Sequence, residues 1–181
     1  MTYREADGTE HRFAQQGGAY VAPAGKHIDL AQSGSGWTLR FRDGTQYTFD
    51  THGLLALQSD LNGNMVVINR DGSGNVTTVV DASGRTVLTF AYASGKISQV
   101  TDVGGRAVRH IYTGEDLTTV IDTVGKSWTF GYDIGHNMIS LADPLGNTRR
   151  FDYDADDRLM HHTDATGAEE FFHYDSPRGR V

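Results

Sequence analysis

The sequence repeats one short motif, Asp-x-x-Gly, six times at a nearly constant interval. Successive aspartates are separated by 21, 21, 20, 21 and 21 residues over the last two thirds of the 181-residue chain. Aspartate favours the first position of a type I turn, because its carboxylate accepts hydrogen bonds from backbone N–H groups two residues on, and glycine favours the fourth position. The pattern predicts turns at Asp60–Gly63, Asp81–Gly84, Asp102–Gly105, Asp122–Gly125, Asp143–Gly146 and Asp164–Gly167.

Between these turns lie runs rich in β-branched and aromatic residues, which suit the pleated, half-buried surface of a sheet. The clearest runs are Val76–Val80, Thr86–Tyr92, Lys126–Tyr132 and Thr148–Tyr153. Each of the last five aspartates is followed by an apolar-x-Tyr element whose tyrosine lies ten or eleven residues on, namely Phe90-Ala91-Tyr92, His110-Ile111-Tyr112, Phe130-Gly131-Tyr132, Phe151-Asp152-Tyr153 and Phe172-His173-Tyr174. A second turn, usually with glycine, follows each element. We therefore expect an all-β fold of tandem antiparallel hairpins with at most a turn or two of helix.

Alternation within these strands predicts the core. Side chains two residues apart in a strand lie on the same face of the sheet, so the three rings of the Lys126–Tyr132 run share a face. The same alternation holds in the Thr86–Tyr92 and Thr148–Tyr153 runs. We expect one buried face that contains Leu88, Phe90, Trp128, Phe130, Tyr132, Phe151 and Tyr153.

The region before the repeats has a hairpin signal of its own. Asp-Gly-Thr-x-x-x-Phe occurs twice, at residues 7–13 and 43–49, and Asp-Gly between strand-like flanks is a strong hairpin signal. The stretch Gln16–Gly36 is rich in Gly, Ala and Ser and is predicted to form loops with a short strand. We expect a leading hairpin and loop segment at 1–36, followed by one continuous repeat sheet at 37–181.

Composition excludes several classes of function. The net charge is −7 and the basic residues are scattered, whereas a nucleic-acid interface needs clustered Lys and Arg. No apolar run approaches the roughly 18 residues of a membrane span, and the polar first residues hold no signal-peptide core. The chain has no cysteine, hence neither disulfides nor thiolate sites. We expect no nucleic-acid partner and no membrane insertion.

The regular Asp-x-x-Gly turns, the Phe-x-Tyr step and the dipeptides Tyr132-Asp133, Tyr153-Asp154 and Tyr174-Asp175 resemble the YD repeats of the Rhs family over residues 37–181. That family includes bacterial Rhs polymorphic toxins, the toxin-complex cocoon and teneurins. The resemblance implies a curved, spiralling sheet, a segment of a shell that encapsulates or presents a C-terminal toxin domain. The partners implied are the rest of the shell and its toxin cargo, in a larger secreted or cell-surface bacterial protein. The first repeat departs from the pattern, with Ile68-Asn69-Arg70 in place of apolar-x-Tyr.

Several motifs resemble catalytic or metal-binding elements, but a structural role explains each of them. Asp143-Pro144-Leu145-Gly146 is similar to the self-cleavage element of Rhs proteins, but it keeps the repeat phase and proline suits a type I turn. Asp71–Asn75 begins like a calcium loop yet lacks the closing Glu. His161-His162 and Glu169-Glu170 are adjacent in predicted strands, so each pair diverges to opposite faces; both histidines are expected to be solvated. We expect no catalytic, metal or cofactor-binding residue, and no enzymatic activity.

The main alternative function is a carbohydrate- or protein-binding adhesion module. The 8 Tyr, 8 Phe and 2 Trp residues would suit sugar stacking, although they fall at core-facing positions. The shell-segment and adhesion-module hypotheses predict different behaviour of the terminal strands. Gly179-Arg180-Val181 begins a turn that the repeat pattern would continue. For a shell segment we therefore expect self-association through a terminal edge strand, or fraying from about Pro177 onward.

Overall fold

A computed structural model describes residues 1–174, and it contains strands and turns without any helix in that range. The described residues accordingly hold no helix that could cross a bilayer. The predicted all-β class is confirmed. The strands are β1 Thr2–Arg4, β2 Glu10–Arg12, β3 Ala14–Gln16, β4 Ala19–Val21, β5 Ile28–Ser33, β6 Gly36–Phe41, β7 Gln46–Phe49, β8 Leu55–Ser59, β9 Met65–Arg70, β10 Val76–Val80, β11 Thr86–Ala93, β12 Lys96–Asp102, β13 Ala107–Thr113, β14 Asp116–Ile121, β15 Ser127–Tyr132, β16 Met138–Ala142, β17 Thr148–Tyr153, β18 Leu159–Thr163 and β19 Glu169–Phe171.

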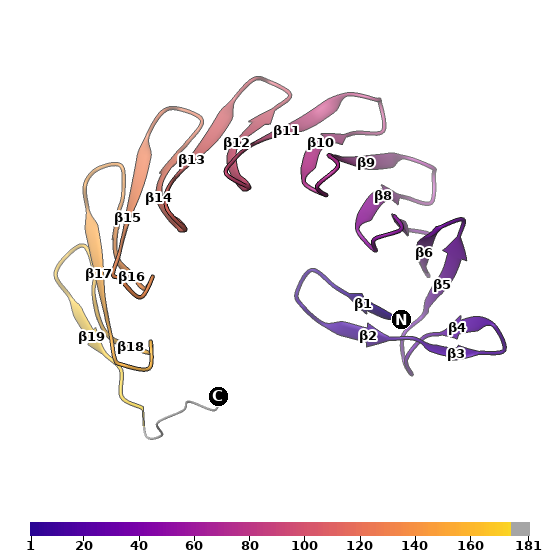
Figure 1. The fold of residues 1–181 in the computed structure, drawn as a ribbon, viewed down its shortest axis with the longest axis horizontal. Helices are drawn as coiled ribbons and strands as arrows, with labels where there is room; N and C mark the ends of the chain where they lie inside the picture. The colour runs from indigo at the N-terminus through magenta and orange to yellow at the C-terminus, as the bar shows by residue number, and fades with distance from the viewer. Residues whose placement is uncertain (175–181) are drawn as a thin grey trace. The chain divides into compact units, whose positions relative to one another are not determined.

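The chain falls into two compact units, residues 1–89 and residues 90–181. In the first unit, strands β3 to β10 pair in chain order and always antiparallel, while β1 and β2 form a hairpin of their own. In the second unit, strands β12 to β19 pair in the same way, each with the next (Figure 1). The predicted tandem hairpins are therefore confirmed within each unit.

The four clearest predicted strands are present, with bounds correct to within one residue. Strands β10 and β17 match the predicted runs residue for residue, and β11 and β15 differ by one residue at one end. The last repeat differs, because β19 ends at Phe171 and its Phe172–Tyr174 element is not a strand. The predictions for the returning turn and for fraying from Pro177 lie outside the described residues.

The expectation of loops with one short strand over Gln16–Gly36 was wrong in part, because the segment holds two strands. The segment forms β4 and all of β5, with Gly17 and Gly18 at positive φ in a tight turn. Ile28 and Leu30 are buried and alternate with the exposed residues Asp29 and Ala31, so β5 presents one face to the core. Ile28 lies opposite Phe41, so the β5–β6 hairpin joins the predicted leading segment at 1–36 to the predicted repeat sheet at 37–181.

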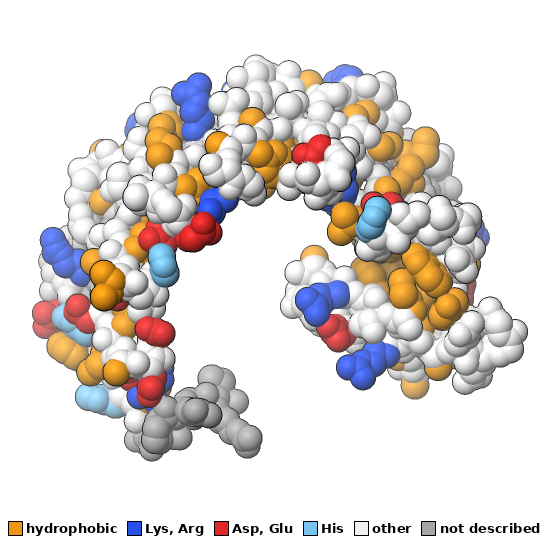
Figure 2. Space-filling view, viewed as in Figure 1, with side chains coloured by type: hydrophobic (Ala, Val, Ile, Leu, Met, Phe, Trp, Pro, Cys, Tyr) orange, Lys and Arg blue, Asp and Glu red, His pale blue; other side chains and the backbone are white. Residues whose placement is uncertain are grey.

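The fully buried core lies in the first unit. Phe13, Ile28, Leu30 and Leu39 are buried, and Leu39 has 0% exposure. They are buried because the β1–β2 hairpin forms a second layer: its Tyr3 ring packs edge-on against those of Phe41 and Phe49, 6.4 and 6.1 Å away. Figure 2 shows hydrophobic side chains gathered over β5 and β6 on this part of the molecule.

In the second unit the strand register places three of the predicted apolar residues on one face, but they are only half-buried. Residues directly opposite each other on antiparallel strands lie on the same face. The register joins a continuous row that we call the aromatic face: Val108, His110, Val120, Trp128, Phe130, Leu141, Arg149, Phe151 and His162. Between residues 90 and 174 no residue is fully buried. The predicted shared face is thus right for Trp128, Phe130 and Phe151, but its full burial was wrong, because no second layer covers it within these residues.

Candidate functional site

Each aspartate turn is organised by the carboxylate of its first residue. In the turn that begins at Asp81, Oδ1 accepts hydrogen bonds from the backbone N–H groups of Ser83 at 2.9 Å and Arg85 at 3.0 Å. Gly84 closes the turn, because its backbone N–H donates to the Asp81 carbonyl. Its φ is 80°, a conformation that glycine adopts without strain. The predicted turn mechanism is confirmed, and the bond to the N–H four residues on is an addition to it.

Hydrogen bonding to the ionised carboxylate changes its titration. The Ser83 hydroxyl is the largest cause, followed by the Arg85 backbone and guanidinium, and together they hold the pKa of Asp81 far below its usual range. Asp102 and Asp154 have lowered pKa values chiefly through the arginine four residues on. These hydrogen bonds within the turn favour the ionised form of each carboxylate.

Two of the four second turns in the second unit, those that begin at Asp133 and Asp154, use the same aspartate chemistry, which the sequence analysis missed. Oδ1 of Asp133 accepts from the N–H groups two and four residues on at 2.8 and 3.0 Å, and Asp154 does the same at 2.9 and 3.0 Å. The signal was present in the dipeptides Tyr132-Asp133 and Tyr153-Asp154, where the aspartate directly follows the strand. Turns of this type close hairpins at both ends of the strands.

The hairpins of the second unit therefore have two rims. The motif rim consists of the Asp-x-x-Gly turns at 102–105, 122–125, 143–146 and 164–167, and the second-turn rim consists of the turns at 93–96, 113–116, 133–137 and 154–158. These turns lie at opposite ends of the strands because consecutive strands run antiparallel.

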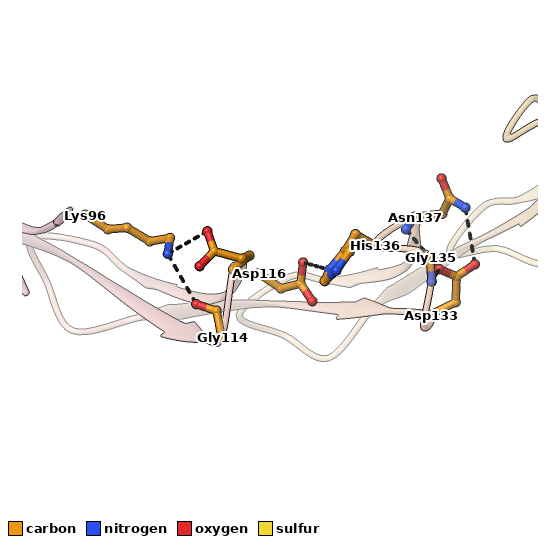
Figure 3. Close-up of polar contacts among 8 residues, drawn as sticks. Lys96, Gly114, Asp116, Asp133, Gly135, His136 and Asn137 are labelled. Atoms are coloured by element: carbon orange, nitrogen blue, oxygen red, sulfur yellow. Dashed lines mark hydrogen bonds and ion pairs between the residues drawn. The ribbon is translucent and has the colours of Figure 1, made fainter. Parts of the chain in front are cut away.

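Side chains on the second-turn rim link one hairpin to the next (Figure 3). Lys96 Nζ lies 2.9 Å from the Glu115 carboxylate and donates to the Gly114 carbonyl at 3.4 Å. His136 Nδ1 lies 2.9 Å from Asp116 Oδ1. The chain of contacts continues through Asn137, whose Nδ2 donates to Asp157 Oδ1 at 2.8 Å.

Two of the linking residues have backbones in the left-handed region. His136 has a φ of 67° and Asp157 a φ of 59°, at the turn position where the aspartate turns elsewhere carry glycine. A non-glycine residue costs about 1–2 kcal/mol in that conformation. Each of these two side chains makes a contact to a turn about 20 residues away, which offsets part of the cost.

The Asp143-Pro144 element is a turn like the others. Asp143 Oδ1 accepts from the N–H groups of Leu145 at 2.8 Å and Asn147 at 2.9 Å, and Gly146 N–H donates to the Asp143 carbonyl at 2.9 Å. The Asn147 side chain adds a bond to Oδ2 at 2.7 Å. The turn interpretation is confirmed.

The paired histidines lie on opposite faces, as predicted, since His162 is opposite Phe151 and His161 is opposite Asp152. The expectation that both are solvated was wrong, because their side chains are only 22% and 23% exposed. Each ring stacks on a phenylalanine, His162 on Phe151 at 5.2 Å and His161 on Phe171 at 4.5 Å. Stacking on an aromatic neighbour in the adjacent strand accounts for the burial.

The glutamates also diverge, Glu169 lying opposite Thr163 and Glu170 opposite His162. Each faces one histidine at long range, His161 at 3.7 Å and His162 at 3.9 Å respectively. The Asp71–Asn75 segment forms an ordinary aspartate turn, with Oδ1 of Asp71 accepting from the N–H groups of Ser73 and Asn75. Residues 1–174 contain no group of three or more side chains placed to hold a metal ion.

The geometry defines a protein of antiparallel β-hairpin repeats, in which side chains of the second turns connect neighbouring hairpins. The RHS Repeat family matches residues 70–107, 112–148 and 136–169, just over half of the chain. The chain belongs to the RHS repeat family. Comparison with curated protein sequences finds no match.

Solved structures with a similar fold include TcdB2-TccC3 without its hypervariable C-terminal region, at a TM-score of 0.54 and 16% identity. TcdB2-TccC3-TEV is similar at a TM-score of 0.54 and 15% identity, and TcdB2-TccC3-Cdc42 at 0.52 and 16%. In each case 89% of this chain aligns with 9% of the other chain. The chain is thus a structural RHS-repeat segment that spans about a tenth of the length of these proteins.

Proposed function

We propose that this chain is a wall segment of a larger RHS-repeat shell that encloses or presents a C-terminal toxin domain, in a secreted or cell-surface bacterial protein. The observation that carries the proposal is the aromatic face, which continues from β13 to β18 and whose side chains, apart from the exposed Arg149, are half-buried. Apolar surface that one sheet layer leaves exposed is stabilised when further protein covers it. The rest of the shell and its cargo would supply that cover.

We also propose that the segment is not catalytic and uses no cofactor. The turn carboxylates, which are the most numerous reactive groups in the repeats, accept hydrogen bonds from their own backbone. The histidines of β18 face opposite sides of the sheet, so the pair does not converge on a substrate. A structural role accounts for these carboxylates and histidines, because each already makes a contact within the sheet or its turns.

Two neighbouring arginines provide a matched test of enclosure. Arg149 lies opposite Leu141 on the aromatic face, whereas Arg150 lies opposite Ser140 on the other face, and both are exposed. The chain has no cysteine, so Arg149→Cys and Arg150→Cys each introduce a single thiol. In the isolated chain we expect both thiols to react with a bulky maleimide at similar rates.

In the complete protein that carries this segment, we expect one of the two thiols to be strongly protected and the other to react as before. A shell wall has one enclosed and one outward face, which produces this asymmetry. Equal reactivity at both positions in the complete protein would contradict enclosure and would favour the adhesion module, whose two faces are both open.

A further inference from the structure

A cavity in the first unit lies between the β1–β2 hairpin and the sheet that the hairpin covers. Its volume is about 560 Å³, within the roughly 300–1,000 Å³ that is usual for ligand sites in proteins. Four aromatic rings line it, Tyr3 from the hairpin and Phe41, Tyr47 and Phe49 from β6 and β7. They pack edge to face, with the ring centres of Phe41 and Tyr47 5.0 Å apart. The cavity therefore has an aromatic wall built from two layers of one unit.

Three neutral polar groups also line the cavity, and none of them has a hydrogen-bond partner among residues 1–174. They are the phenol hydroxyls of Tyr3 and Tyr47 and the amide of Gln58. The register places Gln58 directly opposite Tyr47, so the two side chains lie next to each other on the face that carries Leu39. Burial raises the pKa of Tyr3, as do the nearby Tyr47 and Glu5, so its hydroxyl stays protonated and both donates and accepts.

Packing alone does not explain these polar groups. The same wall has phenylalanine at positions 41 and 49, where a ring without a hydroxyl fills the space. The amide of Gln58 belongs to a cross-strand row whose other members include the aliphatic residues Leu39 and Val66. Polar groups that make no hydrogen bond within the chain are free to bind a molecule that enters the cavity.

The charged side chains at the cavity are already paired within the β1–β2 hairpin and its turn. Arg4 Nε donates to Glu10 Oε1 at 3.2 Å, and Glu5 Oε1 lies 2.7 Å from His11 Nε2. The lining residues therefore offer a ligand neutral hydrogen-bonding groups and no unpaired charge. This arrangement favours a neutral ligand over an anion or a cation, because a charged ligand would lose its hydration without gaining a counter-charge.

We propose that this cavity binds a neutral sugar residue. A hexose ring has apolar C–H groups on its faces, which suit the aromatic wall, and hydroxyls around its edge, which both donate and accept as phenols and amides do. A phenol or indole ring fits less well, because its single polar group would leave two of the three cavity groups without a partner. The proposal concerns the first unit alone and does not depend on the proposed shell role.

The first test is a titration of the full 181-residue chain with the methyl glycosides of glucose, galactose, mannose and N-acetylglucosamine, followed by two-dimensional amide NMR. The competing probe is p-cresol, which has one hydroxyl on an aromatic ring. We expect at least one glycoside to bind with a Kd of about 1–10 mM and more tightly than p-cresol. The resonances that shift should be those of β1, β7 and β8, which carry the three polar groups.

The second test removes each polar group and keeps the aromatic wall. Tyr3→Phe and Tyr47→Phe delete hydroxyls that make no hydrogen bond within residues 1–174, and Gln58→Ala deletes an exposed amide. Each variant should bind the glycoside about two- to tenfold more weakly, the effect of one neutral hydrogen bond, while its urea midpoint stays near that of wild type. Gln46→Ala is the matched control, because Gln46 precedes Tyr47 in β7 and lies on the other face of the sheet. It should leave binding unchanged.

The proposal is overturned if none of the four glycosides shifts an amide resonance at about 100 mM, ten times the weakest expected Kd. It is also overturned if p-cresol binds more tightly than every glycoside, because the cavity then selects an apolar ring. Binding that all three cavity variants leave unchanged, or that Gln46→Ala weakens equally, places the sugar elsewhere and contradicts the proposal. None of these results bears on the shell role, which the maleimide experiment tests separately.

Discussion

The hydroxyl of Tyr153 donates a hydrogen bond to the backbone carbonyl of Met138, 3.0 Å away and 15 residues earlier in the chain. The bond joins the end of β17 to the beginning of β16, at the second-turn rim. Tyr174 makes the same bond to the Leu159 carbonyl at 2.9 Å, again across 15 residues. The tyrosine of the repeat therefore ties one hairpin to its neighbour through its hydroxyl, in addition to packing its ring.

Removal of this hydroxyl should weaken the sheet. We expect Tyr153→Phe to lower the free energy of unfolding by about 0.5–1.5 kcal/mol, the net value of one hydrogen bond, as measured by urea denaturation. Tyr112→Phe is the control, since the Tyr112 ring contacts Lys96 and its hydroxyl has no hydrogen-bond partner among residues 1–174. Equal losses in the two variants would show that the hydroxyl of Tyr153 does not make the tie.

The first repeat replaces this tyrosine with arginine and keeps the tie. Arg70 donates through Nη2 to the Leu55 carbonyl at 3.3 Å, 15 residues earlier, and through Nη1 to the Gly74 carbonyl at 3.0 Å. We expect Arg70→Leu to cost about 1–2 kcal/mol in urea unfolding, because two carbonyls lose a charged donor. Arg70→Tyr should recover at least half of that loss. An Arg70→Tyr chain as unstable as Arg70→Leu would refute the equivalence of the two side chains.

The two units should respond differently to loss of an apolar side chain. Leu39 is fully buried under the β1–β2 hairpin, so Leu39→Ala should cost about 2–5 kcal/mol. Trp128 is larger but half-buried, and we expect Trp128→Ala to cost only about 1–2 kcal/mol, less than the usual value for a buried aromatic. Each loss of stability is measured from the urea unfolding midpoint of the variant relative to wild type. A larger loss at Trp128 than at Leu39 would mean that the aromatic face is covered in solution.

The turns and strands were predictable because their causes are local. The Asp81 turn depends on residues within four positions, and the strand at Thr148–Tyr153 is bounded by two such turns. The sequence therefore contains nearly all the information that these elements need. The Arg70 substitution was noticed as a departure, but its role needed the position of the Leu55 carbonyl, which lies on another hairpin.

Burial was less predictable, because it depends on what covers a face. Alternation correctly placed Trp128, Phe130 and Phe151 together, yet nothing within those strands states whether a second layer lies above them. Ile28 and Leu30 show the reverse case: they lie in a glycine-rich segment that was expected to be mainly loop, yet both are buried. They are buried because the β1–β2 hairpin, which is a separate two-stranded sheet, packs over that part of the first unit.

The last prediction concerns acid stability. Ten turn aspartates have pKa values below the ordinary 3.8 because their carboxylates accept hydrogen bonds in the folded chain. They are Asp7, Asp50, Asp60, Asp71, Asp81, Asp102, Asp133, Asp143, Asp154 and Asp164. A carboxyl whose pKa is lower in the folded than in the unfolded chain stabilises the fold above the unfolded pKa, and that contribution is lost as the pH falls through the folded pKa.

We therefore expect the urea midpoint to fall steadily between about pH 5 and pH 2, as protonation of the unfolded chain becomes favourable. Asp143→Asn offers a way to assign the effect, because the amide oxygen still accepts from the Leu145 and Asn147 N–H groups but does not titrate. This variant should be less stable than wild type at neutral pH and should lose less stability on acidification. Asp29→Asn changes an exposed strand aspartate that closes no turn, so its acid profile should run parallel to wild type. A wild-type midpoint that does not change over this range would mean that the turn carboxylates contribute nothing to folding as charged groups.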